Sequence, residues 1–205
     1  KRGQSTKGEN CLSDMWMFLK KKKLLKYNII SIKDFYHVSL KDRVKINNSI
    51  EKNLLICHSY GYDFSEYYNF PLDDDYTLFF SNLYEKYKKL CYQIFDNFHV
   101  SSQNKSRCLC YRSNKDWSGI NWHNHLATST INGVYYYQVE GDGITFTHKG
   151  KEFHYVPQQG ELLIFPNDLF HKPDIATSDN WRYSINMELM TQESASTLFK
   201  KYGFS

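Results

Sequence analysis

Long apolar runs are absent from this 205-residue chain, in which the longest, such as Met15 to Leu19, span only a few residues. A membrane-spanning helix needs about 20 consecutive apolar residues, so no transmembrane segment is expected. The G-x-S-x-G sequence of α/β-hydrolases is also missing, which argues against that class. Charge of one sign is not in large excess, because 26 Lys+Arg against 22 Asp+Glu gives a net +4. This balance is too mild to indicate a nucleic-acid partner.

A disulfide framework is not expected either. The five cysteines are an odd number and form no C-x-x-C pair; they are Cys11, Cys57, Cys91, Cys108 and Cys110. Such usage is typical of reduced thiols, which predicts a cytoplasmic protein. Cys108 and Cys110 flank Leu109 on one face of an expected strand, where we expect them to act as small buried side chains rather than as metal ligands.

Aromatic residues are abundant, at 17% of the chain, and this is typical of a β-rich globular protein. The length fits one domain over residues 1–205. Within it we expect a flexible arm over 1–10, a mostly helical support over 11–100, a β-core over 105–190 and a C-terminal helix or tail over 191–205.

Two helices are predicted in the first half of the chain. One begins near Ser13 and includes Leu24 and Leu25 in its apolar pattern. The clearer one covers Leu78 to Phe98, where apolar residues recur at three- and four-residue spacing. The segment 35–76 between them is expected to be loop-rich.

Short β-prone runs separated by turn residues follow after residue 105. They predict strands near 107–112, 120–125, 133–140, 143–148, 152–156, 161–165 and 181–189. Strands of this number and spacing favour a sandwich or barrel of the jelly-roll kind, with the helices packed on it.

Three histidines in the β region are spaced like metal ligands. His123 and His125 form an H-x-H pair, and on an extended segment residues two apart point to the same face. His171 follows 46 residues later, next to a turn that contains Pro166. Three imidazoles on one face would hold a transition metal and leave further coordination positions open, as oxygen chemistry requires.

Arg182 and Ser184 lie eleven and thirteen residues past His171 and share one face of the last predicted strand. A guanidinium binds a carboxylate through two charge-assisted hydrogen bonds. The natural ligand is therefore a dicarboxylate that reaches from the metal to Arg182.

At these residues the sequence resembles the iron(II)- and 2-oxoglutarate-dependent oxygenases. It is most similar to a family of oxygenases with many members in phages and marine bacteria, whose pattern is H-x-H, a strand like Ser-Gly-Val-Tyr-Tyr, a Phe-Pro turn before the distal His, and Arg-x-Ser. The matching segments are His123-Asn124-His125, Asn132 to Tyr136, Phe165-Pro166 before His171, and Arg182-Tyr183-Ser184.

The resemblance implies a double-stranded β-helix, a jelly-roll of the cupin kind, with N-terminal supporting helices. It implies that His123 and His171 bind Fe(II) and that Arg182 and Ser184 hold the distal carboxylate of 2-oxoglutarate. By similarity to prolyl hydroxylases, Tyr111 and Tyr136 would also hydrogen-bond this cosubstrate. Tyr135 and Tyr137 face away from Tyr136, so the strand register decides between them.

Position 125 departs from the superfamily, most of which has a carboxylate there. Three interpretations stay open. In the first, which we favour, His125 is the third ligand, as the H-x-H pattern implies. In the second, His125 contacts the ligands but not the metal, which leaves a metal position open. In the third, His125-Leu126-Ala127 corresponds to the H-x-Ala of iron halogenases.

The function implied is a dioxygenase that uses Fe(II), 2-oxoglutarate and O2, releases succinate and hydroxylates a substrate C–H bond. The substrate is a small molecule or a protein side chain. Two other classes share the ligand set: a three-histidine dioxygenase of the cupin kind that does not need 2-oxoglutarate, and a non-catalytic metal-binding barrel.

Overall fold

The computed structural model describes residues 22–53, 55–57, 62–67, 75–96, 98–104, 107–116 and 121–203. The expected arm over 1–10 and the start of the first expected helix near Ser13 lie outside these residues. The described elements are β1 (Lys22–Leu24), β2 (Ile30–Ile32), α2 (Leu40–Asn53), β3 (Leu55–Cys57), β4 (Tyr62–Tyr67), α3 (Asp75–Ile94), β5 (Arg107–Ser113), β6 (Ile131–Gln138), β7 (Ile144–His148), β8 (Lys151–Tyr155), β9 (Leu162–Pro166), β10 (Phe170–Pro173), β11 (Arg182–Leu189) and α4 (Ala195–Lys201).

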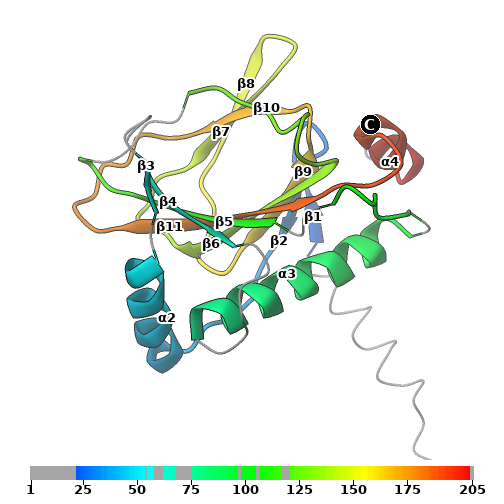
Figure 1. Ribbon diagram of the computed structural model, residues 1–205. Helices are drawn as coiled ribbons and strands as arrows, with labels where there is room; N and C mark the ends of the chain where they lie inside the picture. The colour runs from blue at the N-terminus through cyan, green and yellow to red at the C-terminus, as the bar shows by residue number, and fades with distance from the viewer. Residues whose placement is uncertain are drawn as a thin grey trace, which may run out of the picture.

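The strands form two antiparallel sheets. The large sheet has eight strands in the order β1-β2-β9-β6-β11-β5-β4-β3, and the small sheet has three in the order β10-β7-β8. Helices α2 and α3 lie on one side of the large sheet, and the small sheet lies on the other (Figure 1). The chain is thus mainly β, as predicted, and its antiparallel sheets are consistent with a jelly-roll core.

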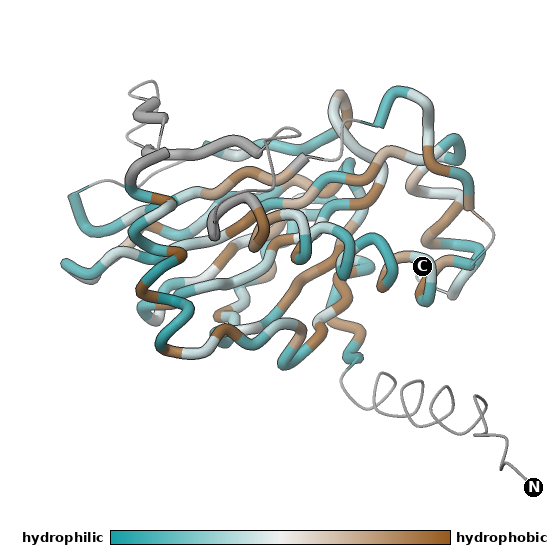
Figure 2. The backbone as a smooth tube through the Cα atoms, turned by 60° about the horizontal axis from the view of Figure 1, so that its bottom comes forward, coloured by the Kyte–Doolittle hydropathy of each residue, from teal (hydrophilic) through white to brown (hydrophobic). Residues whose placement is uncertain are grey.

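Strand alternation separates two hydrophobic cores. Tyr135 and Tyr137 of β6 belong to the core between the large sheet and the helices, whereas Val134 and Tyr136 belong to the core between the two sheets. β6 is buried on both faces, because it lies in the middle of the large sheet. Hydrophobic stretches run along the strands, and hydrophilic ones occur in the peripheral loops (Figure 2).

Helix α3 forms where the apolar spacing predicts a helix, and its buried face includes Leu83, Tyr87 and Leu90. It ends at Ile94, four residues before the predicted end at Phe98. Phe98 extended the apolar pattern because it is also buried, but it reaches the core from outside the helix and stacks on Tyr92 at 4.5 Å between ring centroids.

The first hundred residues contain more β-structure than predicted. Strands β1 to β4 join the large sheet, so Leu24 lies in a strand rather than in a helix. Within 35–76, helix α2 replaces part of the expected loop. Its first turn is capped: Ser39 Oγ accepts a hydrogen bond from Asp42 N at 3.1 Å and donates one to Asp42 Oδ2 at 2.6 Å.

The later predicted strands correspond to β5, β6, β7, β8, β9 and β11. The strand expected over 120–125 is wrong in its described part, where residues 121–125 form only one β-bridge, between His123 and His171. The backbone of His125 instead donates to Asn167 O, in the turn before β10. The segment thus pairs with β10 at His123 only and with the turn before β10 at His125, so no ladder develops.

None of the described helices is both long enough and apolar enough to cross a membrane.

Gly133 lets α3 approach β6 closely. A Cβ atom at Gly133 would lie 2.6 Å from Tyr87 Cε2 and 3.2 Å from Leu162 Cδ1. The Tyr87 hydroxyl also donates a hydrogen bond to Ile131 O at 2.9 Å. The ring therefore cannot move aside without breaking a buried hydrogen bond.

Gly133→Ala should lower the free energy of unfolding by about 1–3 kcal/mol, because the added methyl overpacks this contact. Urea unfolding measures the loss. In a Tyr87→Leu background the methyl has room, so the same substitution should cost clearly less. Equal costs in the two backgrounds would contradict this account of the contact.

Candidate active site

Strand β11 presents a polar face to the space between the sheets. Its Tyr183, Ile185, Met187 and Leu189 pack in the helix-side core. Alternation therefore turns the intervening side chains the other way; these are Arg182, Ser184, Asn186 and Glu188. Because β11 lies between β5 and β6, it brings Ser184 beside Tyr111 of β5 and Tyr136 of β6.

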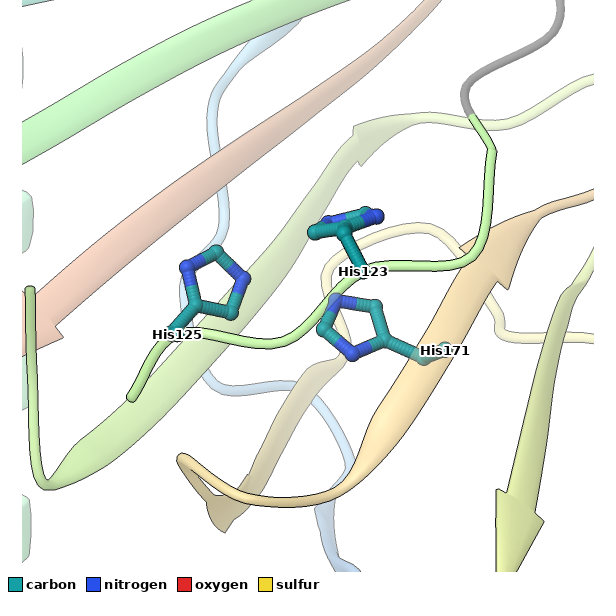
Figure 3. A group of neighbouring side chains, drawn as sticks. All are labelled: His123, His125 and His171. Atoms are coloured by element: carbon teal, nitrogen blue, oxygen red, sulfur yellow. The ribbon is translucent and has the colours of Figure 1, made fainter. Parts of the chain in front are cut away.

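The three predicted histidines meet above this face. One ring nitrogen of each, from His123, His125 and His171, lies within 4.8 Å of the others. His123 and His125 come from the irregular segment before β6, and His171 comes from β10, with the three rings turned toward one space (Figure 3). His123 and His171 also exchange backbone hydrogen bonds of 3.0 and 2.9 Å. These bonds hold the segment with His123 against strand β10, which carries His171.

Each ring is oriented through Nδ1. His123 donates to Asn121 O, His171 donates to Leu169 O, and His125 donates to the Glu188 carboxylate, each at 3.0 Å. A carbonyl or carboxylate oxygen can only accept, so Nδ1 carries the proton in all three rings. Nε2 of each ring is left with its lone pair, as a metal ligand requires.

Burial keeps two of the rings neutral. It lowers the pKa of His171 well below the usual value, with a further decrease from the neighbouring His123 and His125. Burial also lowers the pKa of His123. Neutral imidazole is the form that binds a metal, so His123 and His171 need no proton to be removed first.

A pocket adjoins the histidines. Its lining is Tyr111, His123, Val134, Tyr136, Gly143, Ile144, His171, Pro173, Arg182, Ser184 and Asn186. Six of the seven residues that the sequence singled out therefore line one pocket. The seventh, His125, lies beside it within the histidine cluster.

Arg182 is 5% exposed and is held in a fixed orientation. Its Nε donates to Ser113 Oγ at 3.1 Å, and its Nη2 donates to Asp174 O at 3.2 Å. Its Nη1 lies 4.0 Å from Asp142 Oδ2. Among the described residues Arg182 forms no ion pair with Glu188 or Asp179, the acidic residues nearest to it in sequence: Glu188 pairs with His125, and Asp179 pairs with Lys115.

Two polar atoms in the pocket lack a protein partner within the described part of the chain: the Tyr136 hydroxyl and Asn186 Oδ1, both buried. Burial raises the pKa of Tyr136, so its hydroxyl remains a donor. A buried donor without an acceptor is costly, and a ligand with an anionic oxygen beside Arg182 would satisfy it. The pocket therefore fits a carboxylate at the Tyr136 and Arg182 end.

The structure also resolves the register of the tyrosine strand. Tyr136 faces the pocket and pairs with Ser184, while Tyr135 and Tyr137 face the helices. Ala127, the halogenase-like position, lies in the turn after His125 and lines a different pocket. His123 and His125 both lie beside His171, with ring centroids 4.3 and 5.2 Å away.

Sequence reasoning missed Glu188 and Asn186. Polar residues at every second position of the last strand were a usable signal, since 182, 184, 186 and 188 are all polar between apolar neighbours. Asp142 and Asp174 gave no such signal, because they lie in turns that the fold brings to Arg182.

We expect Tyr136→Phe to leave the stability of the ligand-free protein unchanged or to raise it by up to about 1–3 kcal/mol, because it removes an unsatisfied buried hydroxyl. Tyr87→Phe is the matched control: its hydroxyl is bonded to Ile131 O, so its loss should cost about 1 kcal/mol. Denaturant unfolding of both variants gives the comparison. A larger loss for Tyr136→Phe than for Tyr87→Phe would contradict it.

A divalent transition metal should stabilise the folded protein through the histidines. At Co(II) concentrations 100 times the dissociation constant, the gain is about 2.7 kcal/mol and appears as a higher unfolding temperature. His171→Ala should abolish the gain, whereas His148→Ala, which alters an exposed histidine of β7, should keep it. An equal gain in the wild type and in His171→Ala would exclude this metal site.

No protein-family model matches the chain, and no curated protein matches it in sequence. Solved structures match in fold. A Pseudomonas putida prolyl-4-hydroxylase superposes with a TM-score of 0.60 at 11% identity, covering 86% of this chain and 98% of that one. A Burkholderia pseudomallei oxidoreductase of the 2OG-Fe(II) oxygenase family gives 0.60 at 12% identity, covering 92% and 93%.

A full-length Neurospora crassa protein in complex with alpha-KG, which is 2-oxoglutarate, gives a TM-score of 0.55 at 11% identity, covering 91% of this chain and 82% of that one. These likenesses extend over most of both chains in each case. The chain therefore has the fold of the 2OG-Fe(II) oxygenases.

Proposed function

We propose that the protein is an Fe(II)- and 2-oxoglutarate-dependent oxygenase of the H-x-H kind, with a double-stranded β-helix core. One observation carries the proposal: a cluster of three histidines, two of which line the pocket, adjoins a buried arginine and an unsatisfied tyrosine hydroxyl in that pocket. A metal alone would account for the histidines but not for Arg182 and Tyr136. A ligand that is both a metal chelator and an anion accounts for all of them.

His123, His125 and His171 would hold the iron. When bound, Fe(II) with 2-oxoglutarate and O2 supplies oxidative decarboxylation: one oxygen atom enters succinate, CO2 leaves, and the other atom is inserted into a substrate C–H bond. Three protein ligands leave coordination positions for the keto acid and for O2.

The chain's other residues would bind and orient the cosubstrate. Arg182, fixed by Ser113 and Asp174, would meet the distal carboxylate, and the Tyr136 hydroxyl would donate to it. Ser184 and Tyr111 line the same pocket and would add hydrogen bonds along the dicarboxylate. Because Arg182 is held before any ligand arrives, little orientational freedom would be lost on binding.

The apolar part of the pocket would limit water around the reacting centre. Val134, Ile144 and Pro173 supply these walls. With water limited, the attraction between Arg182 and a carboxylate is stronger than at the surface. The outcome we propose is hydroxylation of a small molecule or a protein side chain.

We also propose that the protein works in the cytoplasm. The free buried thiols of Cys91, Cys108 and Cys110 support this setting.

A three-histidine dioxygenase of the cupin kind is the second candidate, favoured by the all-histidine ligand set. It would oxidise its substrate directly and would have no use for a buried guanidinium in the pocket. The two candidates therefore differ in what Arg182 does.

Arg182→Met should weaken 2-oxoglutarate binding roughly 10- to 100-fold for each charged hydrogen bond lost, while Co(II) affinity stays unchanged. Calorimetric titration of the Co(II)-loaded protein with 2-oxoglutarate measures the first quantity. Arg182→Lys should recover only part of the affinity, because an ammonium lacks the planar fork.

Succinate release is the second readout. With Fe(II), O2, 2-oxoglutarate and ascorbate, which supplies the two electrons that reduce the second oxygen atom to water when no substrate is present, the wild type should form succinate slowly, and Arg182→Met should not. If metal binds but 2-oxoglutarate does not, in either protein, the cupin-type candidate replaces this proposal.

A further inference from the structure

His125 differs from the other two histidines in the group that holds it. Asn121 and Leu169 contribute neutral backbone oxygens to His123 and His171, whereas a carboxylate, Glu188, holds His125. Position 125 is also where the sequence has an imidazole in place of a carboxylate. A carboxylate, that of Glu188, is nevertheless present, hydrogen-bonded to the ring at position 125.

Glu188 lies behind His125, outside the lining of the pocket, and is buried. Its side chain is 4% exposed, and Oε1 accepts from His125 Nδ1 at 3.0 Å, Thr128 Oγ1 at 3.1 Å and Asn186 Nδ2 at 3.2 Å. A buried carboxylate needs such bonds to be retained in the fold. Its position is therefore set by three residues from the turn and strand that surround the histidines.

One of these three hydrogen bonds, from Asn186 Nδ2, also orients the Asn186 side chain. Because its Nδ2 donates to Glu188, its Oδ1 is the atom left without a protein partner among the described residues, and Asn186 lines the pocket. Glu188 thereby fixes both a histidine and an acceptor in the pocket.

A carboxylate that accepts from Nδ1–H fixes the tautomer of the imidazole and makes its Nε2 lone pair a stronger ligand for a metal. It also places an anion near a divalent cation that would otherwise have three neutral protein ligands. On β11, Arg182 and Glu188 point to the same side six residues apart, about 20 Å along the strand. One strand face thus carries a cation at the carboxylate end of the pocket and an anion at the metal end.

We propose that Glu188 is a positioning residue that supplies, through His125, the charge that a carboxylate ligand at position 125 would supply directly. This inference rests on the proposed iron site. It makes the site a three-histidine centre that is complete only with a fourth residue, from β11.

The test is Co(II) affinity, measured by competition with a chromophoric chelator in the absence of 2-oxoglutarate and O2. Glu188→Gln keeps an oxygen that can accept from His125 Nδ1 and removes the charge, while the other carboxylate oxygen, Oε2, is replaced by an amide NH2. We expect it to weaken Co(II) binding roughly 10- to 100-fold. Glu161→Gln is the matched control: Glu161 is a fully buried carboxylate that binds Ser31, Lys33 and Tyr155, and its loss should leave Co(II) affinity unchanged.

A second background separates charge from packing. In His125→Asp the charge is placed on the ligand itself, so adding Glu188→Gln should no longer weaken Co(II) binding and should strengthen it by relieving repulsion. A purely structural role for Glu188 predicts the same loss in both backgrounds, and that result would overturn the inference.

The outcomes also distinguish the two proposals. If the wild type binds no Co(II), or binds it equally after His171→Ala, the metal site itself fails. If His171→Ala abolishes binding while Glu188→Gln binds like the wild type, only the role of Glu188 fails. Thermal unfolding of the metal-free variants verifies that they fold. If Glu188→Gln does not fold, Glu188→Asp, which withdraws the carboxylate by one methylene, takes its place in the same comparison.

Discussion

The two-residue alternation of strand β11 is the constraint on which the site depends. Its apolar residues must face α3 and the helix-side core, so its polar residues have only the space between the two sheets to occupy. β5 and β6 flank β11 and add Tyr111 and Tyr136 to the same space. A shift of one residue in this register would bury Arg182 under the helices and turn Ile185 into the pocket.

Electrostatics then gives the pocket a direction. The guanidinium of Arg182 is fixed at one end, and the histidine cluster backed by Glu188 lies at the other. The unsatisfied hydroxyl belongs to Tyr136 of β6, which lines the same pocket. An elongated ligand with an anionic end and a chelating end matches this arrangement better than a compact one does.

The grouping of the three histidines followed from the sequence more directly than the outer parts of the fold did. The joint spacing of His123, His125, His171 and Arg182 is a property of the sequence itself, so it can be recognised without knowing which elements carry these residues. The strand expected over 120–125 failed because its backbone bonds to the turn before β10, a contact between segments distant in sequence. Strands β1 to β4 are short and owe their pairing to β9 and β5, which no local pattern reports. Helix α2 had one local signal in the sequence, the pair Ser39 and Asp42, which is typical of a helix N-terminus.

The measurement that tests the central claim most directly is an anaerobic titration of the metal-free protein with Fe(II) and then with 2-oxoglutarate, followed by visible absorption. The account predicts a metal-to-ligand charge-transfer band that appears only when both are present, because the keto acid must chelate iron held by the histidines while its far carboxylate meets Arg182. Tight binding of Fe(II) with no band at saturating 2-oxoglutarate would contradict the account and would leave the histidines as a metal site of another class.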